Sequence, residues 1–96
     1  MTDPARPPGL SEPDVERLFL QLERPLFNVV YRWLWDRDDA AEVVQDSFTR
    51  LWQARARVRP DTASAFVYRI ALNLAASRRR WRAIRRFVAQ IGRAHV

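Results

Sequence analysis

Residues 68–87 read YRIALNLAASRRRWRAIRRF, and two different patterns meet near the middle of this stretch. The first half is apolar at helical spacing, with Ile70 and Leu74 on one side and a single amide, Asn73, beside them. The second half carries six arginines around Trp81 and no acidic residue. A helix that needed only a solvated surface would mix its charges. The pattern therefore predicts a helix that enters a core at one end and presents cations at the other.

The chain is small and lacks the side chains that most enzyme classes require. Its 96 residues allow one domain with a modest core. It has no Cys, one His and two Gly, which excludes thiol chemistry and a thiolate zinc site and leaves no glycine-rich phosphate loop. No apolar run approaches the roughly 20 residues that span a bilayer, and the Pro-rich start does not resemble a secretory signal. The sequence predicts a cytoplasmic protein that is not an enzyme and has neither cofactor nor metal site.

Charge is divided unevenly along the chain. Residues 1–61 hold nine Arg and eleven Asp or Glu, a net charge of −2, whereas residues 62–96 hold eight Arg and no acid, a net charge of +8. An extended basic segment suits a polyanion, and neutralisation of phosphates would make its affinity depend on salt. The two halves are therefore expected to face different partners.

Helix signals begin close to the N-terminus. Four of the residues 1–10 are Pro or Gly, so this segment is expected to be a flexible leader. Ser11 is the expected N-cap of the first helix, with Asp14 as its capping-box partner. Pro25 is expected to break or kink this helix before the apolar pattern resumes up to Trp35.

Two further helices complete the expected fold. Asp36 is the expected N-cap of the second helix, which should last to about Arg57 before Pro60 ends it. Asp61 or Thr62 is expected to cap the last helix. No period-2 segment competes, so the sequence predicts an all-α fold, a small bundle of three to four helices. The expected core residues, in chain order, are Val15, Leu18, Phe19, Leu22, Leu26, Phe27, Val30, Tyr31, Leu34, Ala40, Val44, Phe48, Leu51, Trp52, Phe66, Val67, Ile70, Ala71 and Leu74.

The second helix also carries a strip of acidic and amide side chains, which we call the acidic strip. Its members recur at a spacing of three, one and three beside the apolar stripe. Such a strip is usually only a solvated surface. As a docking surface it would suit a basic helix of a partner, because charge complementarity sets register and association rate. The acidic strip consists of Glu42, Gln45, Asp46 and Thr49.

Polar side chains lie at one edge of the apolar stripe in the last helix. Asn73 shares this edge with Arg69 and Arg80 at 100° per residue. Asn73 is either a boundary residue satisfied by a neighbour or a ligand for a base edge between guanidiniums that hold phosphates. Phe66, Tyr68 and Trp81 offer stacking surfaces for unpaired bases, although an Arg-rich amphipathic helix also suits an anionic membrane surface.

Two stretches in this order, DRDDAAEVVQDSFTRLWQAR (residues 36–55) and ASAFVYRIALNLAASRRRWR (residues 63–82), carry a family resemblance. They resemble region 2 of bacterial RNA polymerase sigma factors of the extracytoplasmic-function group, over about residues 18–87. Within this group, the stretch SAFVYRIALNLA (residues 64–75) resembles the ferric-siderophore-responsive subgroup. The resemblance implies a transcription initiation factor that binds core RNA polymerase and recognises and melts the promoter −10 element as single-stranded non-template DNA.

Residue by residue, the resemblance implies two contact surfaces. The family's contact strip for the clamp helices of the polymerase β′ subunit matches Glu42, Gln45 and Asp46, and Thr49 extends it. The family's Asn that holds a flipped base matches Asn73, and its following basic residues match the arginines from position 78. The DNA-binding set expected from the resemblance and the residue pattern is Phe66, Arg69, Asn73, Ser77, Arg78, Arg79, Arg80, Trp81 and Arg82.

The chain departs from complete members of the family in its length. Those members carry a second domain, region 4, a helix-turn-helix that reads the −35 element, and the nine residues after Phe87 are too few to form it. Residues 11–88 are therefore expected to be region 2 alone, a fragment of such a factor. The ending IGRAHV resembles a translation of sequencing-adapter DNA, so residues 89–96 are expected to be either a non-native or an ordinary frayed tail. An anti-sigma protein is a further expected partner, since many family members have one.

A second interpretation needs no polymerase. The chain could be a small helical module whose basic helix binds nucleic acid or an anionic membrane nonspecifically. Such a module would have no need of the acidic strip.

Overall fold

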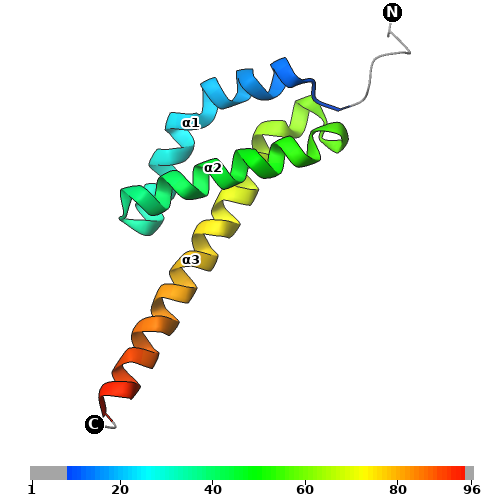
Figure 1. Ribbon diagram of the computed structural model, residues 1–96. Coiled ribbons are helices and arrows are strands. Elements are labelled where there is room, and N and C mark those ends of the chain that lie inside the picture. The colour runs from blue at the N-terminus through cyan, green and yellow to red at the C-terminus, as the bar shows by residue number, and fades with distance from the viewer. Residues whose placement is uncertain (1–8, 95–96) are drawn as a thin grey trace, which may run out of the picture.

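The structure is a computed structural model that describes residues 9–94. Within this range the chain is helical and has no strand. Figure 1 shows α1 and α2 side by side, with the first half of α3 packed against them and its second half projecting as a single helix. The expected all-α bundle is confirmed. Its elements are α1 (Glu12–Leu34), α2 (Arg37–Ala54), the 3-10 turns η1 (Arg55–Arg57) and η2 (Pro60–Thr62), and α3 (Ala63–Ala94).

Helix α1 begins at the capping box that the sequence predicts. The Asp14 backbone N–H donates to Ser11 Oγ at 3.3 Å, and the Ser11 N–H donates to Asp14 Oδ2 at 2.9 Å. Pro25 lies inside the helix and does not break it, although Figure 1 shows the helix bending near its middle. A proline removes one intrahelical hydrogen bond, and here full burial of Leu26 on the neighbouring helices holds the two halves in one element.

The corner between α1 and α2 is fixed by two local signals. Trp35 adopts the left-handed conformation, with φ of 53°, and its N–H donates to the Tyr31 carbonyl oxygen at 2.7 Å. Asp36 then caps α2, because its Oδ1 accepts from the Asp39 N–H at 2.9 Å. The expected N-cap at Asp36 is confirmed. A left-handed residue at the end of a helix reverses the chain, which lets α2 return along α1.

The last residues of the expected leader are packed against the bundle. Leu10 is buried, and its N–H donates to the Arg55 carbonyl oxygen at 2.7 Å. A Cβ atom at Gly9 would collide with the Ala56 carbonyl oxygen, so the chain can pass this point only with glycine. Gly9 and Leu10, the last two residues of the expected leader, thus lie against the bundle, and residues 1–8 lie outside the described range.

The stripe that α3 buries differs from the expected one. Phe66, Ile70 and Leu74, expected at its centre, are only half-buried. Small side chains take the centre instead, which lets the backbone of α3 lie close to α1 and α2. The fully buried residues of this stripe are Ala63, Val67, Ala71 and Ala75.

Helix α2 also buries residues that the apolar pattern did not predict. Val43 and Ser47 are fully buried, and the Ser47 hydroxyl donates to the Val43 carbonyl oxygen at 2.7 Å, which satisfies it inside the core. Phe19 and Trp52, both expected in the core, are 37% and 38% exposed. They border a groove described below.

Helix α3 continues without interruption to Ala94. It therefore runs through residues 89–94, where a frayed tail was one of the two expectations. The two final residues lie outside the described range.

Because Ala71 is fully buried where α3 packs closely on α1 and α2, we expect a larger side chain at this position to destabilise the fold. We expect Ala71→Leu to lower the free energy of unfolding by about 1–3 kcal/mol, because the added atoms would force α3 away from its neighbours. Ala65→Leu on the exposed side of the same helix is the matched control and should change it by less than about 0.5 kcal/mol. Urea unfolding followed by circular dichroism measures both, and equal losses would contradict the packing described here.

Candidate nucleic-acid and protein interfaces

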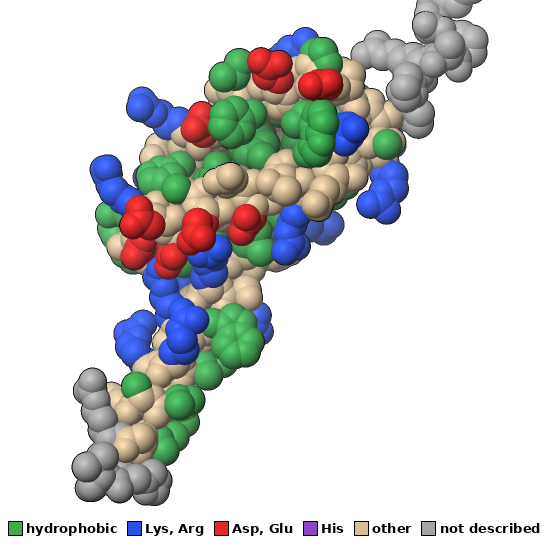
Figure 2. All heavy atoms as spheres, in the orientation of Figure 1, with side chains coloured by type: hydrophobic (Ala, Val, Ile, Leu, Met, Phe, Trp, Pro, Cys, Tyr) green, Lys and Arg blue, Asp and Glu red, His purple; other side chains and the backbone are tan. Residues whose placement is uncertain are grey.

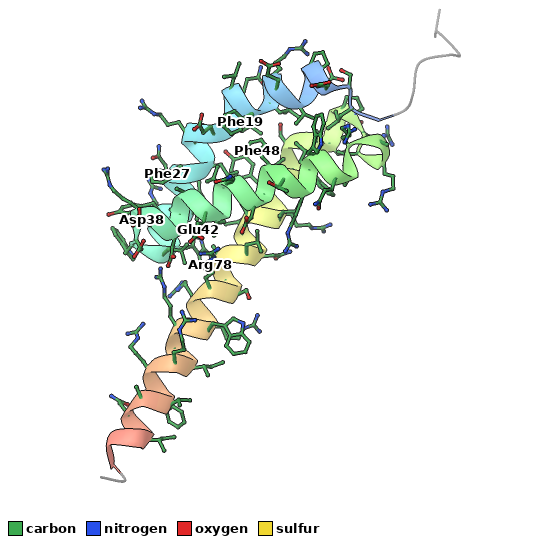
Figure 3. All side chains as sticks on the ribbon, in the orientation of Figure 1. Phe19, Phe27, Asp38, Glu42, Phe48 and Arg78 are labelled. Atoms are coloured by element: carbon green, nitrogen blue, oxygen red, sulfur yellow. The ribbon has the colours of Figure 1, made fainter. Side chains whose placement is uncertain are left out.

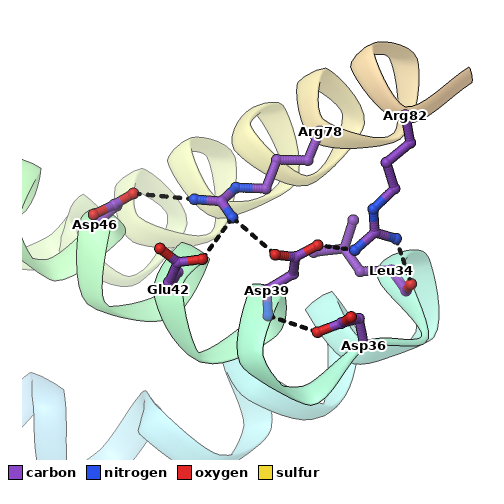
Figure 4. Close-up of polar contacts among 7 residues, drawn as sticks. All are labelled: Leu34, Asp36, Asp39, Glu42, Asp46, Arg78 and Arg82. Atoms are coloured by element: carbon purple, nitrogen blue, oxygen red, sulfur yellow. Dashed lines mark hydrogen bonds and ion pairs between the residues drawn. The ribbon is translucent and has the colours of Figure 1, made fainter. Parts of the chain in front are cut away.

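An ion-pair network joins α2 and α3 at the level where α3 leaves the bundle (Figure 4). Arg78 Nη1 lies 3.3 Å from Asp39 Oδ1 and 3.1 Å from Glu42 Oε2. Arg78 Nη2 lies 3.6 Å from Asp46 Oδ2. The three acids stand at i, i+3 and i+7, so one guanidinium spans successive turns on a single side of α2.

A second arginine ties this network to the end of α1. Arg82 Nη1 donates to the Leu34 carbonyl oxygen at 2.7 Å, and Arg82 Nη2 pairs with the Asp39 carboxylate. The Leu34 carbonyl belongs to the last turn of α1, whose carbonyl groups have no partner within the helix. Arg82, a residue of α3, therefore provides a hydrogen-bond donor for the end of α1 and an ion-pair partner for Asp39 of α2. We call the whole network the clasp, and its members are Asp39, Glu42, Asp46, Arg78 and Arg82.

The nine residues expected to bind DNA do not share one side of α3. At 100° per residue Arg78 and Arg82 continue the buried stripe and point toward α2. The Arg79 guanidinium lies over the Trp33 ring of α1, 5.1 Å from its centroid. The remaining residues lie off the buried stripe of α3, on what we call the outward face: Phe66, Arg69, Asn73, Ser77 and Arg80, with Trp81 at its edge. Phe66 and Ser77 are half-buried at the border of this face.

The outward face presents unpaired hydrogen-bonding groups to solvent. Asn73, Arg69 and Arg80 are exposed, and within residues 9–94 none of their side chains has a hydrogen-bond or ion-pair partner. Trp81 is 57% exposed, and Phe66 is half-buried beside the core. Among the described residues no neighbour satisfies the Asn73 side chain, so its amide is open to solvent.

A groove between α1 and α2 runs beside the acidic strip. All four residues of the strip are exposed, and Gln45 and Thr49 also line the groove, whose volume is about 1150 Å³. Figure 3 shows Phe19, Phe27 and Phe48 between the two helices, and the rings of Phe19 and Phe48 meet edge to face with centroids 5.0 Å apart. The apolar lining consists of Phe19, Phe27, Ala41, Val44, Phe48 and Trp52.

The groove is a feature that the sequence analysis missed. Phe19 and Trp52 were assigned to the core because they follow the apolar spacing of their helices. Their exposure shows that they form the rim of a hollow instead. Figure 2 shows apolar side chains around this hollow, a row of acidic side chains along α2 and basic side chains along α3.

Other kinds of site find no support in the described part of the chain. None of its helices is both long and apolar enough to cross a membrane. Residues 9–94 also contain no cluster of three or more potential ligands that could hold a metal ion.

The fold is a small helical module with an acidic strip on α2 and a basic, acid-free surface on α3. The family described as Sigma-70 region 2 matches residues 18–87. The chain therefore belongs to the sigma-70 region 2 family, a class of transcription initiation domain, not of enzyme, whose partners are RNA polymerase and promoter DNA. The corresponding searches of curated proteins and of solved structures gave no match.

The clasp predicts a difference in stability between two arginines of the same helix. Arg82→Gln should lower the free energy of unfolding by about 1–3 kcal/mol, because it removes a charged hydrogen bond to Leu34 and one of the two guanidinium partners of Asp39. Arg85→Gln makes the same change at an exposed position and should cost less than about 0.5 kcal/mol. Thermal unfolding at matched ionic strength compares the two, and an equal effect would show that the contacts of Arg82 in the clasp contribute no stability.

Proposed function

We propose that this chain is region 2 of a sigma factor of the extracytoplasmic-function group. In this role it binds core RNA polymerase in the cytoplasm and holds the promoter −10 element as single-stranded non-template DNA. The observation that carries the proposal is the presence of an acidic strip and an acid-free basic outward face on two helices that the clasp joins. The SAFVYRIALNLA stretch favours the ferric-siderophore-responsive subgroup.

The acidic strip and the groove together suit one elongated partner. Carboxylates and amides along α2 would meet basic side chains, and the apolar part of the adjoining groove, which Glu23, Arg24, Asn28 and Arg37 also line, would accept apolar ones. Stable protein interfaces combine such an apolar centre with a polar rim. The clamp helices of the β′ subunit are rich in Arg in this family, so we assign them to this surface.

The outward face suits a single strand whose bases have left the duplex. The free amide of Asn73 can donate to and accept from one base edge, while Arg69 and Arg80 hold the flanking phosphates. Extruding a base costs a few kcal/mol of unstacking. Stacking on Phe66 or Trp81 would offset part of that cost.

Polymerase binding is tested by placing a positive charge within the strip without replacing a residue of the clasp. Gln45→Arg should weaken binding of labelled chain to core polymerase by about tenfold or more, since like charges across an interface cost several kcal/mol. Gln21→Arg, the same change at an exposed position of α1 outside the groove, should leave the affinity within about twofold, as expected of a position outside the interface. Fluorescence anisotropy gives both affinities.

No polymerase binding by the wild type, with circular dichroism showing it folded, would contradict the polymerase half of the proposal. This result would favour the second interpretation, a small helical module that binds nucleic acid or an anionic membrane nonspecifically. Salt-dependent binding to unrelated nucleic acids or to anionic vesicles would identify that module.

Base recognition and phosphate contact predict different mutant signatures on the outward face. Asn73→Ala should reduce discrimination at one −10 base, by about 1–3 kcal/mol between the best and the wrong base. Arg80→Gln should weaken all sequences about equally and lower the salt dependence of binding. Single-stranded oligonucleotides varied one base at a time distinguish the two outcomes, and a uniform loss for Asn73→Ala would remove its base-reading role.

A further inference from the structure

The clasp places a residue of the expected DNA-binding set in contact with residues of the acidic strip. Arg78 pairs with Glu42 and Asp46, which are two of the four members of that strip. The clasp contains three carboxylates and two guanidiniums, so it keeps a net charge of −1. The strip therefore stays attractive to a cationic partner even while Arg78 is bound to it.

The ion pairs of the clasp differ in how firmly they are held. Arg82 and Asp39 are 23% and 29% exposed, and Arg82 is anchored a second time on the Leu34 carbonyl. The partners of Arg78 on the strip are far more open, with Glu42 63% and Asp46 54% exposed. Exposed ion pairs contribute little to stability and are screened by salt. Arg78, which is 30% exposed, can therefore leave the strip at small cost. What then still holds it is Asp39, a carboxylate that it shares with the more firmly anchored Arg82.

From this difference we propose that Arg78 is an exchangeable internal counter-ion. In the free domain it neutralises Glu42 and Asp46. When basic side chains of a partner take those carboxylates, the Arg78 guanidinium becomes available to a nucleic-acid phosphate beside α3. The identity of that partner as RNA polymerase rests on the function proposed above.

The exchange couples the two surfaces of the domain without a change of fold. By thermodynamic linkage, occupation of the strip strengthens phosphate binding at Arg78, and phosphate binding at Arg78 strengthens occupation of the strip by the same factor. Arg80 is the internal comparison, since it faces outward, has no acidic partner among residues 9–94 and is available to phosphates at all times.

The test mimics occupation of the strip by removing one carboxylate. Affinity of the full chain for a labelled single-stranded oligodeoxynucleotide is measured by anisotropy over a range of salt. Glu42→Gln releases Arg78 from one partner, whereas Asp38→Asn removes the same charge from an exposed residue of α2 outside the clasp. Both variants should bind more tightly than the wild type through the general charge effect.

The expected result is a severalfold larger gain for Glu42→Gln than for Asp38→Asn. The salt slope should also steepen, by about 0.7 for one additional phosphate contact on a single strand. In an Arg78→Gln background the excess of Glu42→Gln over Asp38→Asn should vanish. Glu42 is exposed, and circular dichroism checks that each variant remains helical.

Three results would overturn the proposal. These are equal gains for the two acid variants, an excess that survives without Arg78, and no oligonucleotide binding by any folded variant. Because the assay contains no polymerase, it separates this proposal from the proposed function. Suppose that Glu42→Gln gains more oligonucleotide affinity than Asp38→Asn, that this difference depends on Arg78, and that the chain does not bind polymerase. This result would support the role of Arg78 as an exchangeable counter-ion and would reject only polymerase as the partner of the strip.

Discussion

The direction of α3 depends on a single carboxylate between two guanidiniums. Asp39 stands in the first turn of α2, its N–H is bound by the cap residue Asp36, and its side chain receives both Arg78 and Arg82. Removing one partner of a partly buried network leaves the others incompletely paired, which is why such networks act as units. The exposed part of α3 that follows Arg82 is therefore oriented by the ion pairs of Asp39 and by the apolar packing of the first half of the helix.

The packing below the clasp depends on small side chains. The alanines at 63, 71 and 75 and Val67 let the backbone of α3 lie against α1 and α2, and the larger apolar residues of α3 are displaced to the edges of that contact. This rotation sets which residues look outward. It exposes Asn73 and Arg80 to solvent and places Arg78 against the acidic residues of α2. One choice of buried stripe thus places both the free amide and the paired arginine.

Features governed by neighbours in the chain could be predicted from the sequence, and features governed by a second helix could not. The caps at Ser11 and Asp36 are local, because their partners lie three residues away, and both are present as expected. The rotation of α3 was misjudged because apolar size favours Phe66, whereas close helix packing favours alanine. The groove and the pairing of Arg78 each need two helices, and a run of arginines gives no sign of which cations have internal partners.

The tryptophans of this domain lie at its surface, although aromatic residues usually dominate a core. All four are at least 38% exposed: Trp33 under the Arg79 guanidinium, Trp35 at the corner of α1 and α2, Trp52 on the rim of the groove and Trp81 at the edge of the outward face. Indole emission depends on local solvent and charge. The natural fluorescence of this protein is therefore a reporter of what touches its surfaces, with Trp52 on the side assigned to polymerase and Trp81 on the side assigned to DNA, and only a weak reporter of whether its core is intact.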